Sequence, residues 1–499
     1  MIRRAGRVLP TGAAFRDLLD SATVAALVLS PAWAALPATH PLGIEDSALL
    51  PGATRSDNLA ALVLLAAGTL VSCILITAGR TNTSRALSWG TRGAGAVAAL
   101  LIGNALRSEL ELTGLNVGIG TDDFWVHAAT LFCLVAVMSY VVVRFGAANA
   151  VRGALRILMP LAPILVIEIG LAAVTAPSAG VSSRISAPDA HAEPSPRRVV
   201  VMVFDQLDAG DVSRLLARGL LPGFAALQTH AVVDTAEASA GDTVSAVPSM
   251  LSGETLVGSV SGDQLLMESA DGSPHDWLTY PDLFMDLAQT GLRTGVAGWY
   301  LPYCRLPAAW IAECYQFPLV DTVGHSGLRT AMIRQLQRLV PWHSRMSHIR
   351  AYQGIRNVAL AMVADPNLDF VFIHWPIPHG PGIYDSDRRQ LSFRQYCGLQ
   401  AEYEGNLRLV DRTIVETLSK VASSRTVSER TILVVTGDHG RANRLGGRVS
   451  LQVPFYTHSA AFTTSAGSGH VETTGLRQLV NRIFEDGVPY PTGGLSRVR

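Results

Sequence analysis

The sequence predicts a membrane domain of five helices followed by an α/β domain with a largely parallel sheet between helices. Three observations lead to this fold class. Apolar stretches of about 20 residues occur only within residues 1–176. A segment rich in Pro, Ser and Ala follows at 177–197, as expected of a solvated linker. Over 198–499, short β-branched runs alternate with helical segments.

The composition supports a membrane protein. The chain has 499 residues, 40 Lys plus Arg and 40 Asp plus Glu, so no net charge attracts nucleic acid. Charged residues make up 16%, below the norm of about 25%, and the mean hydropathy is +0.28. These values argue against a nucleic-acid partner and against a wholly soluble enzyme. Lys420 is the only lysine, a bias that indicates a high-GC bacterial source.

Each of the five apolar stretches is about as long as the ~20 residues needed to cross the hydrocarbon core. They cover residues 18–38, 58–79, 88–106, 124–143 and 155–176. A cleaved signal peptide is the alternative for the first stretch, but four further spans follow and no small-residue cleavage site stands out. Glu168 lies inside the fifth stretch, where an ionisable group is costly, and its role stays open.

The distribution of arginine predicts the orientation, because short cytoplasmic loops retain Arg. The amino terminus and the second and fourth loops hold Arg3, Arg4, Arg7, Arg16, Arg80, Arg85, Arg92, Arg144, Arg152 and Arg156. The first and third loops hold only Arg55 and Arg107. The amino terminus is therefore expected inside a bacterial cytoplasmic membrane. With five spans, the domain after residue 176 lies outside the cytoplasm.

The outer domain is expected to contain four buried strands and one long helix. The strands are predicted at 199–204, 294–300, 368–375 and 431–437, and the amphipathic helix at 391–422. Cys304 and Cys314 lie ten residues apart in a predicted loop, where an oxidising compartment allows a disulfide. The sequence leaves that bridge open.

Acidic and histidine residues directly follow two of these strands. Asp205 ends VVVMVFD, and Asp438 and His439 follow TILVVTG. Open α/β sheets bind ligands at the carboxyl ends of their strands, so these side chains are expected to share one crevice. Because Zn²⁺ accepts both carboxylate and imidazole ligands, the pattern predicts a zinc site.

The motif HWPIPHGP adds His374 and His379 after a third strand. A histidine at a strand end is often structural, so the role of His374 stays open. PHGP is a stiff, exposed turn with little use for a core imidazole. A functional role is therefore expected for His379.

The segment ASAGDTVSAVPSMLSGE, residues 238–254, places a hydroxyl near a helix amino terminus. Backbone amides there favour anions such as phosphate. A hydroxyl needs a base or a metal to become a nucleophile at neutral pH, and a zinc site would provide one. Thr243 is the preferred nucleophile, and Ser245 is the main alternative.

Taken together and in this order, FDQLD, DTVSAVPSMLSG, HWPIPHGP and GDHG resemble the motifs of the alkaline phosphatase superfamily, in its sulfatase-like branch. The resemblance covers residues 198–460. The sulfatase-like branch includes the membrane phosphoethanolamine and phosphoglycerol transferases, whose layout is five spans followed by an outer catalytic domain. An alkaline-phosphatase-like fold is thus implied for the outer domain.

The resemblance implies a role for each matching residue. Asp205 falls on the first acidic metal ligand, and Asp438 and His439 fall on the Asp-His metal pair. The nucleophilic Thr of the transferases lies five residues before the Pro of VPxM, which is Thr243 here, and its oxygen also binds the metal. His379 matches the His of the HGP motif, which contacts phosphate or a second metal.

The chain also departs from the pattern. The transferases have Glu where Asp205 stands, and a further His where this chain has Leu451 and Gln452. Sulfatases place their nucleophile two residues before the Pro, at Ala246 here, and CxPxR is absent, so sulfate hydrolysis is disfavoured. One Zn²⁺ is expected. Whether a second metal binds stays open. His458, in another register, is the suggested replacement for the missing histidine ligand.

Structural alternatives exist for these residues. Asp205 alone is compatible with capping a turn, and Thr243 with capping a helix. The motifs together favour metal ligation and nucleophilic attack instead. Asp208, Asp411 and Tyr403 are expected to cap or pack.

The leading hypothesis is a metal-dependent transferase. It would move a phosphoryl-linked headgroup from a phospholipid donor to an envelope glycolipid or polymer acceptor through phospho-Thr243. The alternatives are a membrane-tethered phosphodiesterase or phosphatase and a metal-poor pseudoenzyme that acts as a scaffold. The sequence identifies neither headgroup nor acceptor.

Overall fold

The computed structural model describes twelve segments of the chain and one single residue. These are residues 18–26, 29, 54–81, 161–175, 183–185, 194–261, 264–318, 327–339, 342–392, 399–441, 449–459, 465–466 and 471–485. The chain forms two compact units. The first unit contains Met1–Ile44, Gly52–Gly180 and Val320–His343, and the second contains Glu45–Pro51, Val181–Leu319 and Ser344–Arg499.

The first unit contains helices from three of the five apolar stretches. Residues 18–26 are helical, and α2 (Arg55–Thr81) and α6 (Leu161–Thr175) correspond to the second and fifth stretches. The stretches at 88–106 and 124–143 lie outside the described residues, as does the side chain of Glu168. Within the described part, Arg55–Ile74 is the one helix long and apolar enough to cross a membrane. The five-span arrangement therefore stays a prediction.

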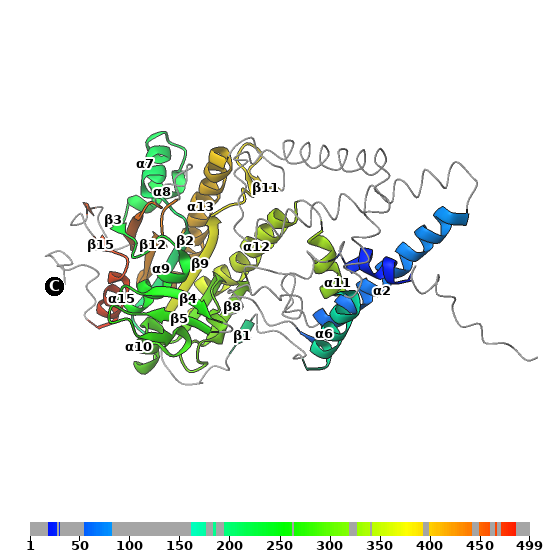
Figure 1. The fold of residues 1–499 in the computed structure, drawn as a ribbon. Coiled ribbons are helices and arrows are strands. Elements are labelled where there is room, and N and C mark those ends of the chain that lie inside the picture. The colour runs from blue at the N-terminus through cyan, green and yellow to red at the C-terminus, as the bar shows by residue number, and fades with distance from the viewer. Residues whose placement is uncertain are drawn as a thin grey trace, which may run out of the picture. The chain divides into compact units, whose positions relative to one another are not determined.

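The helix α11 (Leu328–Gln337) also belongs to the first unit, although it lies far along the chain. It packs against α2 (Figure 1). The sequence does not predict that this segment joins the first unit, because 320–343 contains no apolar stretch long enough to be a span.

The second unit is an α/β domain built on a ten-stranded mixed sheet with the order β1-β8-β7-β9-β2-β12-β13-β3-β14, with β15 paired to β3. The strands are β1 (Ser183–Ile185), β2 (Arg198–Asp205), β3 (Ala231–Glu237), β7 (Thr294–Tyr300), β8 (Glu313–Pro318), β9 (Phe370–Pro378), β12 (Thr431–Gly437), β13 (Gln452–His458), β14 (Ser465–Ala466) and β15 (Val471–Glu472). The five strands from β8 to β12 are parallel, whereas β1 and β13 pair antiparallel to their neighbours. The predicted parallel sheet is thus confirmed at its centre, and its edges are mixed.

Helices cover both faces of this sheet (Figure 1). One face carries α9 (Thr243–Ser252), α10 (Leu283–Gln289) and α15 (Gly475–Glu485). The other carries α7 (Ala209–Ala217), α8 (Pro222–Gln228), α12 (His343–Ala364) and α13 (Leu399–Ala422), and α14 (Arg425–Arg430) precedes β12.

The central strands are buried on both faces, which explains their continuous apolar runs. In β2, Val199, Val201 and Val203 pack into one core cluster, whereas Met202 and Phe204 pack into the other. Successive side chains of a strand point to opposite faces, so one strand contributes to both cores. The strands predicted at 199–204, 294–300, 368–375 and 431–437 are confirmed.

The predicted long helix is shorter than expected. It was placed at 391–422, but α13 begins at Leu399 among the described residues, and Gln390–Leu391 forms β11, which pairs with β10 (Tyr384–Asp385). A second small sheet contains β4 (Val257–Ser261), β5 (Gln264–Glu268) and β6 (Pro274–Asp276). Two 3₁₀ turns, Trp277–Thr279 and Tyr303–Arg305, complete the elements.

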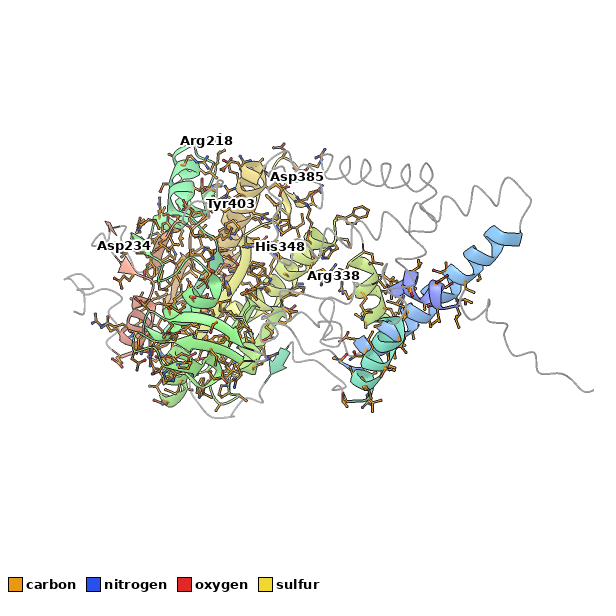
Figure 2. The ribbon with its side chains drawn as sticks, in the orientation of Figure 1. Arg218, Asp234, Arg338, His348, Asp385 and Tyr403 are labelled. Atoms are coloured by element: carbon orange, nitrogen blue, oxygen red, sulfur yellow. A yellow bond between two sulfur atoms is a disulfide. The ribbon has the colours of Figure 1, made fainter. Side chains whose placement is uncertain are left out.

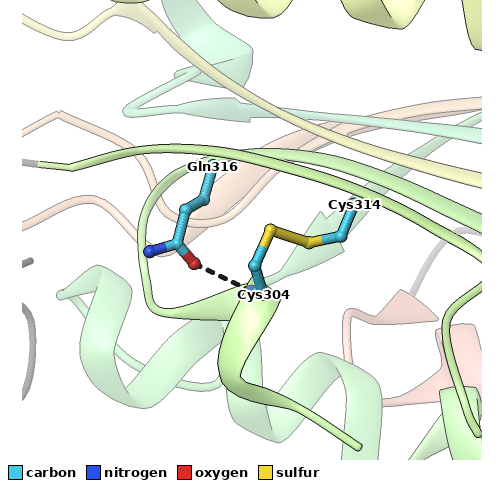
Figure 3. Close-up of a disulfide and its surroundings, with 3 residues drawn as sticks. All are labelled: Cys304, Cys314 and Gln316. Carbon is cyan, nitrogen blue, oxygen red and sulfur yellow. Dashed lines mark hydrogen bonds between the residues drawn. A yellow bond between two sulfur atoms is a disulfide. The ribbon is translucent and has the colours of Figure 1, made fainter. Parts of the chain in front are cut away.

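Cys304 and Cys314 form a disulfide (Figure 3). The bridge joins the turn after β7 to the second residue of β8, and the backbone N–H of Cys304 donates to Gln316 Oε1 at 2.8 Å. The bridge that the sequence left open is thus present, and it fixes the loop that carries Tyr303.

Candidate metal centre and active site

The site lies where three adjacent parallel strands end. Asp205 is the last residue of β2, Asp438 directly follows β12, and His374 lies in β9 opposite Val203 of β2. Phe204 pairs with Gly437, so the two aspartates leave the sheet at the same level. Parallel register therefore places these three side chains together, as the position of ligands in open α/β sheets predicts.

Asp438 is the hub of the site. Its Oδ1 accepts the backbone N–H groups of Gln206 at 3.0 Å and His439 at 2.7 Å, and its Oδ2 accepts the Thr243 hydroxyl at 2.8 Å. These bonds fix both carboxylate oxygens within the fully buried site.

The turn after β2 is strained to make one of these bonds. Gln206 has φ 65°, a left-handed conformation that side chains other than glycine rarely adopt. Tyr403 of α13 (Figure 2) holds the turn, because its hydroxyl donates to the Gln206 carbonyl at 2.7 Å and accepts the Asp208 N–H at 3.2 Å. Tyr403 thus packs as expected and also positions the amide that binds Asp438.

The helix α9 brings Thr243 to Asp438. Asp242 caps this helix by accepting the Ser245 N–H at 2.9 Å, so α9 begins at Thr243 with its amino terminus at the site. The Ser245 hydroxyl instead accepts the Gly258 N–H at 3.0 Å, on the side of β4. Of the two candidate nucleophiles, the structure brings Thr243 to the carboxylates.

His439 presents a lone pair to the two aspartates. A carbonyl can only accept, so the bond of 2.8 Å between His439 Nδ1 and the Gly440 oxygen requires the proton on Nδ1. In the neutral ring Nε2 then carries a lone pair, which lies 3.6 Å from Asp438 Oδ2 and 3.9 Å from Asp205 Oδ1. Three electron-rich atoms thus face one point.

Unpartnered atoms show that the residues fit a cation. Asp205 Oδ1 and His374 Nε2 are buried and have no hydrogen-bond partner in the described structure. Ligand atoms of Asp205, His374 and Asp438 lie within 4.8 Å of one another. Buried polar atoms are normally paired, so this convergence indicates a missing positive charge. Carboxylate and imidazole donors suit Zn²⁺.

The repulsion between Asp205 and Asp438 also supports a cation site. Burial, and then the charge of Asp438, raises the pKa of Asp205 well above its usual value. Among the described residues, no arginine or lysine lies within 4 Å of either aspartate to offset this repulsion. A bound cation would neutralise the pair.

His374 joins the site, which the sequence did not settle. Its Nδ1 lies 2.9 Å from the Tyr303 hydroxyl, and its Nε2 lies 4.0 Å from Asp438 Oδ2. Burial lowers its pKa to about 4, which favours the neutral ring that binds metal. The available signal was its position on a buried strand beside β2, but strand order could not be read from the sequence.

The backbone of His379 contacts Asp205, but its side chain is not part of the ligand group formed by Asp205, His374 and Asp438. Its backbone N–H donates to the Asp205 carbonyl at 3.1 Å, and its Nδ1 donates to the Gly380 carbonyl at 2.6 Å. The half-buried ring packs edge-on to Trp299, with ring centroids 5.4 Å apart. Burial lowers its pKa. Its catalytic role stays a prediction.

His458 does not complete a second site, so that suggestion is wrong. It pairs with Leu433, five residues before Asp438, and lies about 16 Å away along the strand. Its Nδ1 donates to the Leu227 carbonyl at 3.0 Å. Leu451 packs against the core, and Gln452 is exposed.

The remaining predicted capping residues have structural roles. Asp208 caps α7 by accepting the Asp211 N–H at 3.0 Å, and Asp411 accepts the Phe224 N–H of α8 at 2.8 Å. These contacts account for both carboxylates away from the metal centre.

Comparison with known proteins finds similarity in three dimensions only. No family model and no curated protein matches the chain. Among solved structures, a 2-O GAG sulfatase is 12% identical, with 60% of this chain and 72% of that chain covered and a TM-score of 0.39. The lipoteichoic acid synthase LtaP from Listeria monocytogenes is 11% identical, with 61% and 75% covered and a TM-score of 0.39.

A protein of the alkaline phosphatase superfamily from Vibrio parahaemolyticus is 12% identical, with 60% and 72% covered and a TM-score of 0.36.

Proposed function

We propose that the protein is a metal-dependent transferase that acts on phosphate esters. It moves a phosphoryl-linked headgroup, of the phosphoethanolamine or phosphoglycerol kind, from a phospholipid to an envelope glycolipid or polymer. One observation carries the proposal: the Thr243 hydroxyl, at a helix amino terminus, lies 2.8 Å from Asp438 in a cluster of unpartnered metal-type ligands.

The metal would be held by Asp205, Asp438, His439 and the Thr243 oxygen, with His374 as a further donor. When bound, Zn²⁺ supplies a Lewis acid that lowers the pKa of a coordinated hydroxyl and offsets developing negative charge. The donor set fits this ion, because it combines carboxylate and imidazole donors and two of its buried atoms, Asp205 Oδ1 and His374 Nε2, lack other partners.

The chain's own residues then perform two displacements. The Thr243 oxygen attacks phosphorus, its proton passes to Asp438 Oδ2, and the bond from phosphorus to the diacylglycerol oxygen breaks. The exposed amides at the start of α9 bind the phosphoryl oxygens. Diacylglycerol leaves as the alcohol after taking up a proton from solvent, and the headgroup phosphate stays on Thr243.

In the second displacement an acceptor hydroxyl attacks the phosphorus, the bond to Thr243 breaks, and the Thr243 oxygen takes back the proton held by Asp438 Oδ2. Because His379 Nδ1 donates to Gly380, its neutral ring leaves Nε2 free to accept the proton of that hydroxyl. The half-buried position of His379 gives this proton a route to solvent.

The membrane arrangement is part of the proposal. A lipid donor requires a site at the bilayer, and α2 supplies an apolar helix of sufficient length. The Cys304–Cys314 bridge supports an extracytoplasmic position for the catalytic unit, because disulfides persist in oxidising compartments.

The test follows the headgroup. Purified full-length protein is incubated with a headgroup-labelled phospholipid, with and without envelope acceptor, and Thr243 is examined by mass spectrometry. A headgroup phosphate on Thr243 that transfers to the acceptor supports the transferase. Release at full rate without acceptor would instead make the protein a phosphodiesterase or phosphatase.

Metal analysis separates both enzymes from a scaffold. We expect about one zinc per chain, as one complete site implies. Less than about half a zinc per chain, with unchanged cellular function in Thr243→Ala, would identify a pseudoenzyme.

A further inference from the structure

The helix α11 has one face that packs against α2 within the first unit (Figure 1). Ala331, Gln335 and Arg338 recur every three to four residues and are buried. Gln335 Nε2 donates to the Asp57 carbonyl, in the first turn of α2, at 2.9 Å. Arg338 marks this region in Figure 2. The contact fixes α11 beside the start of the candidate membrane span.

The face of α11 turned away from α2 is exposed and carries both apolar and polar side chains. Ile333 and Leu336 are each 43% exposed there, beside the exposed Arg329 and Thr330, and Trp342, five residues after the helix, is also 43% exposed. Large apolar side chains that flank an arginine suit the boundary between lipid headgroups and acyl chains.

The charge of the segment also suits that boundary. Residues 327–343 contain Arg329, Arg334 and Arg338 and no acidic residue. Arginine near an anionic membrane surface gains electrostatic attraction, and tryptophan is enriched at the membrane interface. The exposed side chains of α2, including Leu59 and Val63, extend the apolar surface along the neighbouring span.

We propose that α11 and Trp342 rest on the anionic surface of the outer leaflet, with Ile333 and Leu336 inserted among the lipids and Arg329 at the headgroup phosphates. The topology is consistent, because both the start of α2 and all residues after 176 lie outside in the predicted orientation. The inference rests on the proposed membrane attachment and adds a lipid contact from the chain segment between two halves of the catalytic unit.

Photocrosslinking of the full chain in nanodiscs tests this contact. Benzoylphenylalanine replaces Ile333, and the discs contain phosphatidylcholine with or without phosphatidylglycerol. We expect a lipid adduct at position 333, with a yield roughly five-fold higher in the anionic discs and lowered by a similar factor in Arg329→Gln. Replacement of Val415, 41% exposed on α13, is the matched control, and no lipid adduct is expected there.

A third position separates this inference from the membrane proposal. Leu70 of α2 is 62% exposed, and a probe there reports the span itself. An adduct at Leu70 without one at Ile333 overturns the α11 contact and leaves the span intact. Absence of both overturns both proposals. A protein adduct of twice the chain mass at Ile333 would assign the face to a second copy and overturn the lipid contact.

Discussion

The two ends of the central sheet both bury charged residues, but they treat them differently. At the amino end of β2, the Arg198 guanidinium donates to the carbonyls of Leu368 and Met362 at 2.8 Å and to that of Asp365 at 3.3 Å. Nearby, Asp369 accepts two backbone N–H groups. At the carboxyl end, Asp205 faces Asp438 and His374 with atoms that have no partner.

The difference separates structural burial from functional burial. Three carbonyls accept hydrogen bonds from the Arg198 guanidinium and connect β2 to the end of α12, although Arg198 Nη1 has no partner. At the other end the same strand brings like charges and lone pairs to one point, which is unfavourable without a cation. The convergence of like charges and metal-type ligand atoms, rather than burial or an unpartnered atom, therefore identifies the functional end.

Thr243→Ala tests the functional end and has the largest expected effect. We expect transfer to fall by about 1,000-fold or more, equivalent to ~4 kcal/mol in the barrier, because the hydroxyl that bonds to Asp438 is lost. Ser245→Ala is the matched control on the same helix, and its activity should be retained. Equal loss in both variants would show that α9 as a whole, and not Thr243, matters.

Arg198→Met tests the structural end. We expect the free energy of unfolding to fall by about 2–4 kcal/mol, since the carbonyls of Leu368 and Met362 lose their donor. The folded protein should still bind about one zinc. Denaturation in detergent and metal analysis measure these quantities. Normal stability with lowered zinc content would contradict a purely structural role for Arg198.

His374→Gln tests whether the strand histidine belongs to the metal centre. We expect zinc affinity to fall roughly 10–100-fold, measured by competition with a chelating dye. The metal-free protein should lose only the hydrogen bond between His374 Nδ1 and the Tyr303 hydroxyl, about 0.5–1.5 kcal/mol, because His374 Nε2 has no protein partner. Unchanged affinity with lowered stability would make His374 a core residue.

His348→Asn tests how the buried His348, next to His379, makes the stability of the protein depend on pH. Burial, and then His379, lowers the pKa of His348 from 6.5 to about 3, so the unfolded chain binds the proton more readily. Stability should therefore rise with pH between about 3 and 6.5, by ~1.4 kcal/mol per unit from this group. The variant should lack that contribution in denaturation series across this range. Parallel curves for both proteins would contradict it.

Much of the catalytic unit follows from local sequence. Strands buried on both faces appear as continuous apolar runs, so β2, β7, β9 and β12 could be predicted. Asp205 and Asp438 were expected to meet because side chains that follow parallel strands converge in an open sheet, whereas Thr243 was expected beside them from the family resemblance.

Other features depend on long-range packing. His374 could not be assigned because the order β9-β2-β12 is set by tertiary structure. His458 was misplaced because the antiparallel direction of β13 carries it away from the site. The packing of α11 against α2 was not predicted, because the moderate hydropathy of its segment does not indicate a partner helix. A short helix that packs elsewhere leaves no periodic signal of its partner.

The Cys304–Cys314 disulfide links assembly of the site to the compartment in which the chain folds. Cys304 follows Tyr303, whose hydroxyl lies 2.9 Å from His374, so the bridge to β8 restrains the group that orients this imidazole. In the proposed orientation, a newly made chain would acquire that restraint only after export, where thiols are oxidised. Assembly of the site would then be completed only on the outer side of the membrane.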